Sequence, residues 1–279
     1  MRILVINADD LGFAPGVNRG ILEAHAAGTV TSASMIVTAP AFAEAAERVQ
    51  SEAKGLGVGL HLNLVSGAAL SSVPSLVDPA TGRFCPLDVL VRRALAGQVD
   101  PAEVRRECEA QLAKLVAAGI TPTHIDSHRH VHAMPGILPA VAAVAHDAAI
   151  PVVRRPLDRV SLLDPVASAK MLVVHAAWRT ALTGVAPAHR GLLARAPHFR
   201  GIAMQGMPDI RDRLLATIDQ LPIGTTEIMV HPGYDDEVLA AQDAFRAERM
   251  VEVRALCDPA VVARLQKGDV KLVSFRAFV

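Results

Sequence analysis

The chain has 279 residues, 51% of them apolar, which is enough for one large hydrophobic core, so we expect a single domain over residues 1–279. Lys plus Arg number 28 and Asp plus Glu also number 28, and this balance excludes a chain-wide field that would hold nucleic acid or an acidic membrane surface. Every apolar run is interrupted well short of the roughly 18 residues that a membrane span needs, so we expect a soluble protein without such a span.

Strands and helices are expected to alternate in the first part of the chain. Residues 2–8, 32–38 and 56–64 are mainly apolar runs and are predicted to be strands. A helix starting near Pro15 follows the first strand, and the Ala-rich residues 41–53 form a second helix. The N-terminus carries too short an apolar run for a secretory signal. It is therefore interpreted as part of a first βα unit.

The clearest helical pattern lies in the middle of the chain. Pro101 opens it and Gly119 follows its end. The apolar residues at helical spacing are Val104, Cys108, Leu112, Leu115 and Val116. A strand in residues 122–132, a helix over 135–149 and a short strand in 150–155 are expected next.

The last part of the chain contains a segment of different character. Residues 160–200 are Ala- and Leu-rich helical pieces, and we expect a helical lid or an excursion from the main fold there. A helix over 209–221 and strands in 225–231 and 270–275 complete the pattern. About seven strands alternating with helices predict an α/β fold with a mostly parallel sheet, closed or nearly closed into a barrel.

Acid, imidazole and guanidinium groups follow five of the expected strands at the point where each strand ends. Loops that leave the carboxyl ends of parallel strands converge on one face, so these groups are expected to meet. They are Asp9 and Asp10, His61, the Asp126/His128 group, Arg154 and His231.

Asp9 and Asp10 are adjacent, so both can approach one centre only if the strand ends and bends there, which Gly12 would permit. Two carboxylates so close disfavour each other's charge unless a cation neutralises one of them. A metal ion would take one carboxylate as a ligand and leave the other as a base. The alternative is that the pair caps the following helix.

The segment HIDSHRHVH has a polar titratable residue at every second position. In an extended chain these residues would all face one side. They are His124, Asp126, His128, His130 and His132. A catalytic metal site uses about three protein ligands, so the remaining groups would support the ligands or face the substrate. The alternative is a solvated strand edge.

Three further residues are candidates for the same site. His61 lies between leucines and would ordinarily be a core histidine, but its place at a strand end favours a metal ligand. His231 precedes a Pro-Gly turn and is a candidate proton donor. Arg154 could orient Asp9, and Arg155 competes with it for that role.

With these residues identified, the sequence resembles the YdjC family of carbohydrate deacetylases, which contains the diacetylchitooligosaccharide deacetylases and the hopanoid-associated deacetylases. The matching segments are NADDLG, VNRGILEAHAAGTVTSASMIV, GLHLNL, PTHIDSHRHVH, IPVVRRP and TEIMVHPG. They occur in order across nearly the whole chain. The segment HFRGIAMQG is similar to the hopanoid-associated branch.

The resemblance implies a distorted TIM-like barrel and one divalent metal ion, Mg²⁺ or Zn²⁺, held by Asp10, His61 and His128. It implies Asp9 as general base and His231 as general acid. The groups implied to support the ligands or face the substrate are Asn63, His124, Asp126, His130 and His132. Aromatic residues are only 3% of the chain, which favours a short substrate, namely a small acetylated amino sugar or a glycolipid head group.

The implied reaction is metal-dependent removal of an acetyl group from an N-acetylated amino sugar, with release of acetate. Two alternatives stay open: a phosphoesterase or amidohydrolase with a second metal, and a catalytically silent protein that binds sugar or metal. Cys85, Cys108 and Cys257 lie far apart, so we expect reduced thiols and a cytoplasmic protein. The sequence leaves a homodimer open.

Overall fold

The structure is a computed structural model, and it describes residues 1–159 and 165–279. Within them, one sheet contains seven strands, all paired in parallel. The strands are β1 (Arg2–Leu11), β2 (Ser32–Met35), β3 (Gly57–Leu62), β4 (Ile125–Ser127), β5 (His198–Arg200), β6 (Gly224–Val230) and β7 (Val270–Leu272).

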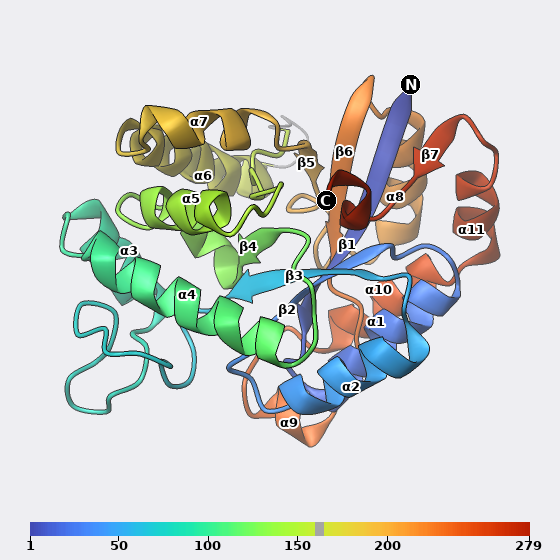
Figure 1. Cartoon of the computed structure of the whole chain (residues 1–279). Coiled ribbons are helices and arrows are strands. Elements are labelled where there is room, and N and C mark those ends of the chain that lie inside the picture. Colours follow the sequence, from blue (N-terminus) through green and yellow to red (C-terminus); the bar gives the residue numbers. More distant parts are fainter. Residues whose placement is uncertain (160–164) are drawn as a thin grey trace.

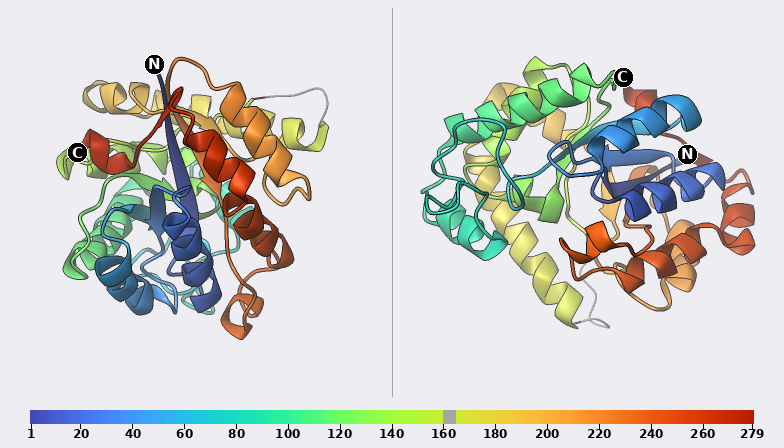
Figure 2. Two further views of the ribbon diagram at one scale, coloured as in Figure 1. Left: turned by 90° about the vertical axis from the view of Figure 1, so that its right-hand side faces the viewer. Right: turned by 90° about the horizontal axis from the view of Figure 1, so that it is seen from below.

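Helices surround this sheet. The helices are α1 (Pro15–Ala26), α2 (Phe42–Glu52), α3 (Leu87–Leu95), α4 (Pro101–Ala117), α5 (Leu138–Asp147), α6 (Pro165–Thr183), α7 (Pro187–Ala194), α8 (Ile210–Asp219), α9 (Glu237–Ala240), α10 (Ala247–Leu256) and α11 (Pro259–Leu265), with 3-10 turns η1 (His128–Ala133) and η2 (Phe275–Phe278). Figure 1 shows β1 and β6 side by side, with α1 and α10 packed together next to them. Seen from below in Figure 2, the helices form a ring around the strands.

The strand order is β4-β3-β2-β1-β6-β5, and β7 pairs with the beginning of β1. The end strands β4 and β5 do not pair with each other, so the sheet is a half-barrel that is open between them. Val153 forms one isolated bridge beside β4 at Ile125. The predicted α/β fold with a distorted barrel of parallel strands is confirmed. Parallel strands buried on both faces explain why β1 is almost continuously apolar before its acidic end.

The predicted and observed strands differ in several places. The segment 122–132 is a strand only over Ile125–Ser127, because the chain then turns into η1. Residues 150–155, predicted to be a strand, contribute only the bridge at Val153. The short strand β5, over His198–Arg200, was not predicted, since three residues carry too little periodic signal.

The floor of the half-barrel is closed by the C-terminal end of the chain. Phe275, expected on a strand, lies instead at the start of η2, buried in a small cluster with Val5 and Val152. Its backbone N–H donates to Ser32 Oγ at 2.9 Å, and the ring of His124 lies against it with centroids 4.3 Å apart. This apolar plug leaves the opposite end, where the strands terminate, for the site.

The segment expected to be a lid is partly outside the described residues, because residues 160–164 are not among them. The described part forms α6 and α7, which pack against α5. Trp178 and Leu193 are buried in the main core. These helices thus form part of the wall around the sheet. Among the described residues, no helix combines the length and the apolar character that a membrane crossing requires.

Candidate active site

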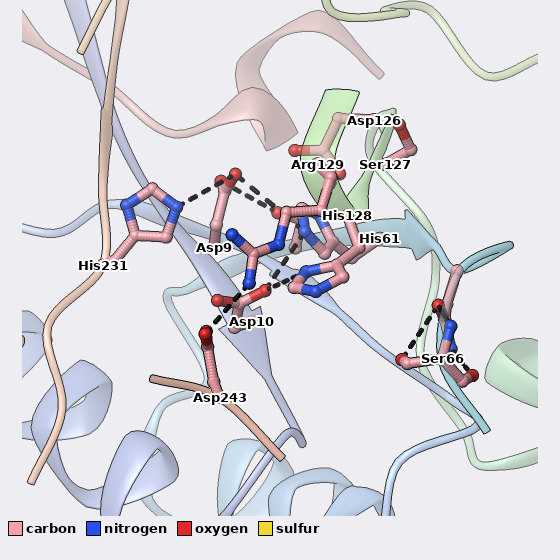
Figure 3. Close-up of polar contacts among 12 residues, drawn as sticks. Asp9, Asp10, His61, Ser66, Asp126, Ser127, His128, Arg129, His231 and Asp243 are labelled. Atoms are coloured by element: carbon pink, nitrogen blue, oxygen red, sulfur yellow. Dashed lines mark hydrogen bonds and ion pairs between the residues drawn. The ribbon is translucent and has the colours of Figure 1, made fainter. Parts of the chain in front are cut away.

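A cavity of about 150 Å³ lies at the carboxyl ends of β1, β3 and β6 and beside η1. Its lining includes Asp9, Asp10, His61, His128 and His231. These residues come from segments that are far apart in the sequence. The convergence expected from the strand ends therefore exists in the fold. Figure 3 shows these side chains pointing toward one another.

The end of β1 is bent so that both of its acidic side chains reach the cavity. Asp10 has a φ of 71°, in the left-handed region, and Gly12 has a φ of 89°. The pairing of β1 with β2 shifts register between Ala8 and Leu11. The bend thus begins at Asp10 itself, two residues before Gly12. Backbone strain of this kind costs about 1–3 kcal/mol and persists where surrounding contacts enforce it.

Asp10, His61 and His128 form a compact buried group. Asp10 Oδ1 lies 2.9 Å from His128 Nδ1 and 3.3 Å from His61 Nε2. One candidate ligand atom from each residue lies within 4.8 Å of the other two. Two imidazole nitrogens and one carboxylate oxygen at this spacing can hold a divalent ion.

The surroundings of His61 favour a positive charge at this place. Its Nδ1–H donates to Asp126 Oδ1 at 2.7 Å, which leaves Nε2 directed at Asp10. Burial lowers the pKa of His61, but the charges of Asp126 and Asp9 outweigh it and raise this pKa to about 10. The field that attracts a proton to Nε2 also attracts a metal cation. The donor set therefore fits a divalent metal.

Arg154 holds Asp9 from below the cavity. It is 1% exposed, and its two terminal nitrogens donate to Asp9 Oδ2 at 2.7 Å and to Asp9 Oδ1 at 2.6 Å. Nη2 also lies 2.7 Å from Asp126 Oδ2, and Nε donates to Glu227 Oε1 at 2.9 Å. Arg155, the sequence competitor, takes no part in this network and lines a different cavity.

Glu227 and Arg249 were missed by the sequence analysis. Burial raises the pKa of Glu227 to about 7, against the opposing charge of Arg154. Arg249 Nη2 donates to Asp10 Oδ2 at 2.7 Å and to Asp243 Oδ2 at 3.2 Å. Burial opposes the charge of Asp10, but Arg249 and His128 hold the pKa of this carboxyl well below its usual value.

The two residues were missed for different reasons. Glu227 is a single charged residue between Thr226 and Ile228 on β6, and a charged residue in a strand is typically found on a solvated face. Arg249 lies on α10 in the charged segment AERMVEVRAL, which resembles an exposed helix surface. Only the burial of both residues, each 1% exposed, shows that they face the site.

His231 lies at the end of β6, where its backbone N–H donates to Glu252 Oε2. Its Nε2 is 3.9 Å from Asp9 Oδ2. Burial lowers the pKa of His231 to about 4, although Asp9 and Asp10 oppose this shift. The imidazole is therefore neutral near pH 7 in this structure, whereas the role of general acid implied by the resemblance starts from the protonated form.

The HIDSHRHVH segment does not stay extended, so the expectation that its polar residues face one side is wrong. Arg129 and His130 have φ values of 58° and 55°, which turn the chain after His128. His128 and His130 line the cavity. His132 instead lies between Ser127 Oγ and the backbone oxygen of Arg154, at 2.6 and 2.9 Å.

Two other candidates lie outside the cavity. His124 packs against Phe275 at the floor of the half-barrel. Asn63 shapes the turn after β3, where its Oδ1 accepts from the backbone N–H of Ser66 at 3.1 Å. Asp126 also does not line the cavity but contacts His61 and Arg154 directly beneath it.

Two further groups of potential ligands are present among the described residues. One is buried and consists of Asp9, His61 and Asp126, so it shares His61 with the first group. The other lies on the surface. His146, Asp147 and His189 also have candidate atoms within 4.8 Å of one another, but the first two residues are exposed. This group is remote from the cavity in the fold, at the end of α5 and in α7. Because this surface group could also bind an ion, it has to be considered when the metal ions bound per chain are counted.

The chain is similar over nearly its whole length to two bacterial enzymes. It is 35% identical over 278 residues to a carbohydrate deacetylase of Geobacillus stearothermophilus, covering 99% of this chain and 98% of that protein. It is 31% identical over 275 residues to a chitooligosaccharide deacetylase of Yersinia enterocolitica, covering 98% of each.

The structure is also similar to a crystal structure from Enterococcus faecalis V583, of a protein named for cellobiose-phosphate cleavage. The TM-score is 0.78 at 26% sequence identity, covering 99% of this chain and 98% of that chain. A family model described as YdjC-like protein matches residues 3–267. The resemblance found in the sequence is thereby confirmed, and the chain belongs to the YdjC-like family.

Proposed function

We propose that this chain is a metal-dependent carbohydrate deacetylase, a hydrolase that removes the acetyl group from an N-acetylated amino sugar and releases acetate. The observation that carries the proposal is that two adjacent aspartates reach the same cavity but have different partners. Asp10 lies with His61 and His128, while Asp9, next to it, is bound by Arg154. The names of the two bacterial relatives support the same reaction.

Asp10, His61 and His128 would hold the metal. When bound there, a divalent cation would act as a Lewis acid on the acetamide carbonyl and would make a water molecule more acidic. A set of one carboxylate and two imidazoles accepts several divalent ions, and we propose Mg²⁺ or Zn²⁺. Among the described residues, a second buried group of potential ligands, Asp9, His61 and Asp126, shares His61 with this set. Arg154 already binds both carboxylates of that second group, which favours one catalytic metal over the two that the phosphoesterase alternative needs.

Asp9 would act as the general base. Arg154 fixes both of its oxygens, and Asn7 Nδ2 and Ser34 Oγ also contact Oδ1 at 2.9 and 3.2 Å. Its Oδ2 is directed toward the cavity, 4.0 Å from His61 and 3.9 Å from His231. Asp9 would remove the proton from the attacking water as the water forms a bond to the acetyl carbon. A protein that only binds sugar or metal has no need for a rigidly held carboxylate that is not itself a metal ligand.

His231 would deliver a proton to the leaving nitrogen. Since its imidazole is neutral before the reaction, we propose that the proton taken by Asp9 reaches His231 Nε2 and passes from there to the amine. Asp9 Oδ2 and His231 Nε2 are 3.9 Å apart, which is longer than a hydrogen bond, so the transfer would pass through a bridging water or the substrate. Arg154 acts through Asp9 and does not line the cavity, so we propose it as a positioning residue.

The substrate would be small. A cavity of about 150 Å³ accommodates an acetamide group and part of one sugar ring. Among its described lining residues there is no Trp, Tyr or Phe on which a long sugar chain could stack. We therefore propose a small acetylated amino sugar or the acetylated head group of a glycolipid, entering with its acetamide toward Asp9.

An acetate-release assay tests the proposal. A panel of N-acetylated mono- and disaccharides is incubated with the enzyme, with and without a chelator. We expect acetate from at least one sugar, loss of activity with chelator and recovery on addition of Mg²⁺ or Zn²⁺. Hydrolysis of phosphate esters in place of acetamides would refute the proposal and favour the phosphoesterase alternative.

The metal count requires a control variant. In wild-type protein, the surface group of His146, Asp147 and His189 can bind a second ion that has no part in the reaction. We expect one metal per chain in His189→Ala, with full activity. Two metals in that variant would indicate a second ion in the cavity.

Location and assembly stay predictions. All three cysteines are free thiols in the structure, which agrees with the proposed reducing cytoplasm. A homodimer remains a prediction from the sequence.

A further inference from the structure

A cavity of about 440 Å³ lies outside the half-barrel, between α6 and α7. Its lining includes Arg155, Arg179 and Arg190, together with the apolar side chains of Trp178 and Leu193. It shares no lining residue with the active-site cavity. Figure 1 shows these two helices beside α5, at the edge of the molecule.

In the part of the chain that the structure describes, the three guanidinium groups have no acidic partner. Among the described residues, none of them forms an ion pair or a hydrogen bond to a carboxylate, and no described lining residue is acidic. Arg190 is fixed by donating from Nε to the backbone oxygen of Val185 at 3.1 Å. Three cations around one cavity, in a chain with no net charge, repel one another unless an anion joins them.

A second cavity with three arginines provides a comparison. That cavity, of about 400 Å³, is lined by Arg159, Arg200 and Arg213. There, Arg213 donates to Asp209 at 2.7 Å and Arg200 lies 3.9 Å from Asp158. Most of its charge is therefore already compensated within the chain, whereas the charge of the α6/α7 cavity is not.

We propose that the α6/α7 cavity binds a phosphate monoester attached to an apolar or ring-shaped group. Guanidinium groups bind phosphate oxygens in pairs. A monoester carries about 1.5–2 negative charges and three terminal oxygens, which match three guanidinium groups better than the single charge of a carboxylate. Trp178 and Leu193 would contact the organic part.

The cavity is linked to the active site through successive contacts of Trp178, His132 and Arg154. The ring of Trp178 contacts the ring of His132 edge-on, with centroids 6.5 Å apart. His132 in turn contacts the backbone oxygen of Arg154 at 2.9 Å, and Arg155 is the next residue in the chain. Arg155, which the sequence suggested as a partner of Asp9, thus has a different role in this proposal.

The test is a titration of the protein with phenyl phosphate, in which isothermal titration calorimetry measures the binding. We expect saturable binding of one molecule per chain, which weakens as salt is added. The substitutions Arg155→Gln, Arg179→Gln and Arg190→Gln should each reduce affinity about tenfold, since each removes a charge-assisted contact.

Two control variants identify the site. Arg195 follows α7 and its Nε also donates to a backbone oxygen, that of Gly191 at 3.2 Å, but it does not line the cavity. Arg195→Gln should therefore bind phenyl phosphate as the wild type does. His128→Ala should also retain binding, because His128 does not line the α6/α7 cavity. Loss of binding in this variant would instead locate the phosphate at the proposed catalytic metal.

The proposal is overturned if phenyl phosphate does not bind, if Arg195→Gln weakens binding as much as the three cavity variants, or if only His128→Ala weakens it. Circular dichroism of each variant verifies folding, and Arg179 and Arg190 are exposed enough for their substitution to leave the core intact. Binding is measured without turnover, so the result does not depend on the proposed deacetylation.

The phosphate could belong to the substrate or to a separate small molecule. The KM values for N-acetylglucosamine and its 6-phosphate in Arg179→Gln distinguish these sources. A higher KM for the phosphorylated sugar alone assigns the phosphate to the substrate. Unchanged KM values for both, with weaker binding of phenyl phosphate, assign it to a separate ligand.

Discussion

The two adjacent aspartates at the end of β1 occupy different electrostatic environments. Asp9 is paired with Arg154, and Asp10 with Arg249 and two histidines. Each carboxylate is thus neutralised by its own buried guanidinium group, so both can be ionised although they are adjacent. This division of partners underlies the proposal that one acid holds a metal while its neighbour handles a proton.

Replacing Asp9 with Asn should lower kcat by about 100-fold or more, because the amide cannot accept a proton from water. Metal content, measured by elemental analysis, should stay unchanged. His128→Ala is the opposite case, since it should lose metal together with activity. Unchanged turnover in Asp9→Asn would remove Asp9 from the mechanism, and full metal content in His128→Ala would remove His128 from the ligand set.

Replacing Asp126 with Asn should weaken metal binding by roughly 10- to 100-fold. The substitution removes a negative charge next to the site and replaces the carboxylate that accepts from His61 Nδ1–H by an amide oxygen, which is a weaker acceptor. Both effects act in the same direction. Titration of the metal-free protein with Mn²⁺ measures the change. An affinity equal to that of the wild type would mean that Asp126 contributes only to packing around Arg154.

At the scale of elements, the site depends on how β3 and β4 approach each other. The ring and the backbone oxygen of His124 lie so close to β3 that a Cβ added at Gly59 would be 2.5 Å from them. Gly59 is therefore required for close contact between two strands that carry His61 and Asp126. The floor of the half-barrel and the ligands at its mouth are linked by this pair of strands.

Gly59→Ala should destabilise the protein by about 1–3 kcal/mol, as expected for overpacking in a dense core. Urea unfolding measures the free energy of unfolding. Gly55→Ala is a suitable control, because a Cβ there meets nothing within 4 Å, and it should change stability by no more than about 0.5 kcal/mol. Equal effects of the two substitutions would contradict the proposed close packing at Gly59.

At the scale of the whole molecule, the proposed ligands come from three separate segments: the end of β1, the end of β3 and the turn after β4. A bound ion would connect segments that are distant in the sequence and would be absent from the unfolded chain. Metal binding should therefore add directly to global stability.

At a free metal concentration about 100 times Kd, binding stabilises the folded protein by about 2.7 kcal/mol. Removal of the metal with a chelator should therefore lower the Tm by about 5 °C. Differential scanning calorimetry measures this shift. His128→Ala should show a much smaller shift with chelator, because it has no ion to lose from the cavity. The same large shift in that variant would locate the stabilising ion elsewhere, for example at His146, Asp147 and His189.

The sequence by itself determined the α/β class, the parallel arrangement and the chemical types at the strand ends, because these follow from local periodicity and from where apolar runs stop. The ends of apolar segments indicated that Asp9, Asp10, His61 and the Asp126/His128 group would meet, and the resemblance to the YdjC family selected Asp10, His61 and His128 among them as the expected metal ligands. Helix α4 followed its predicted bounds closely, although Val116, counted with its apolar face, is 53% exposed.

Only the tertiary structure decided which polar residues share the cavity. HIDSHRHVH has the alternation of a strand, but left-handed residues 129 and 130 rotate its last part, so His132 and His130 diverge. The roles of Arg249 and Glu227 and the choice of Arg154 over Arg155 could not be predicted from the sequence. The burial of each charge and its partner depends on segments that are 73 residues apart for Arg154 and Glu227 and 239 residues apart for Arg249 and Asp10. Local patterns specify elements, whereas long-range packing selects the partners of each charge.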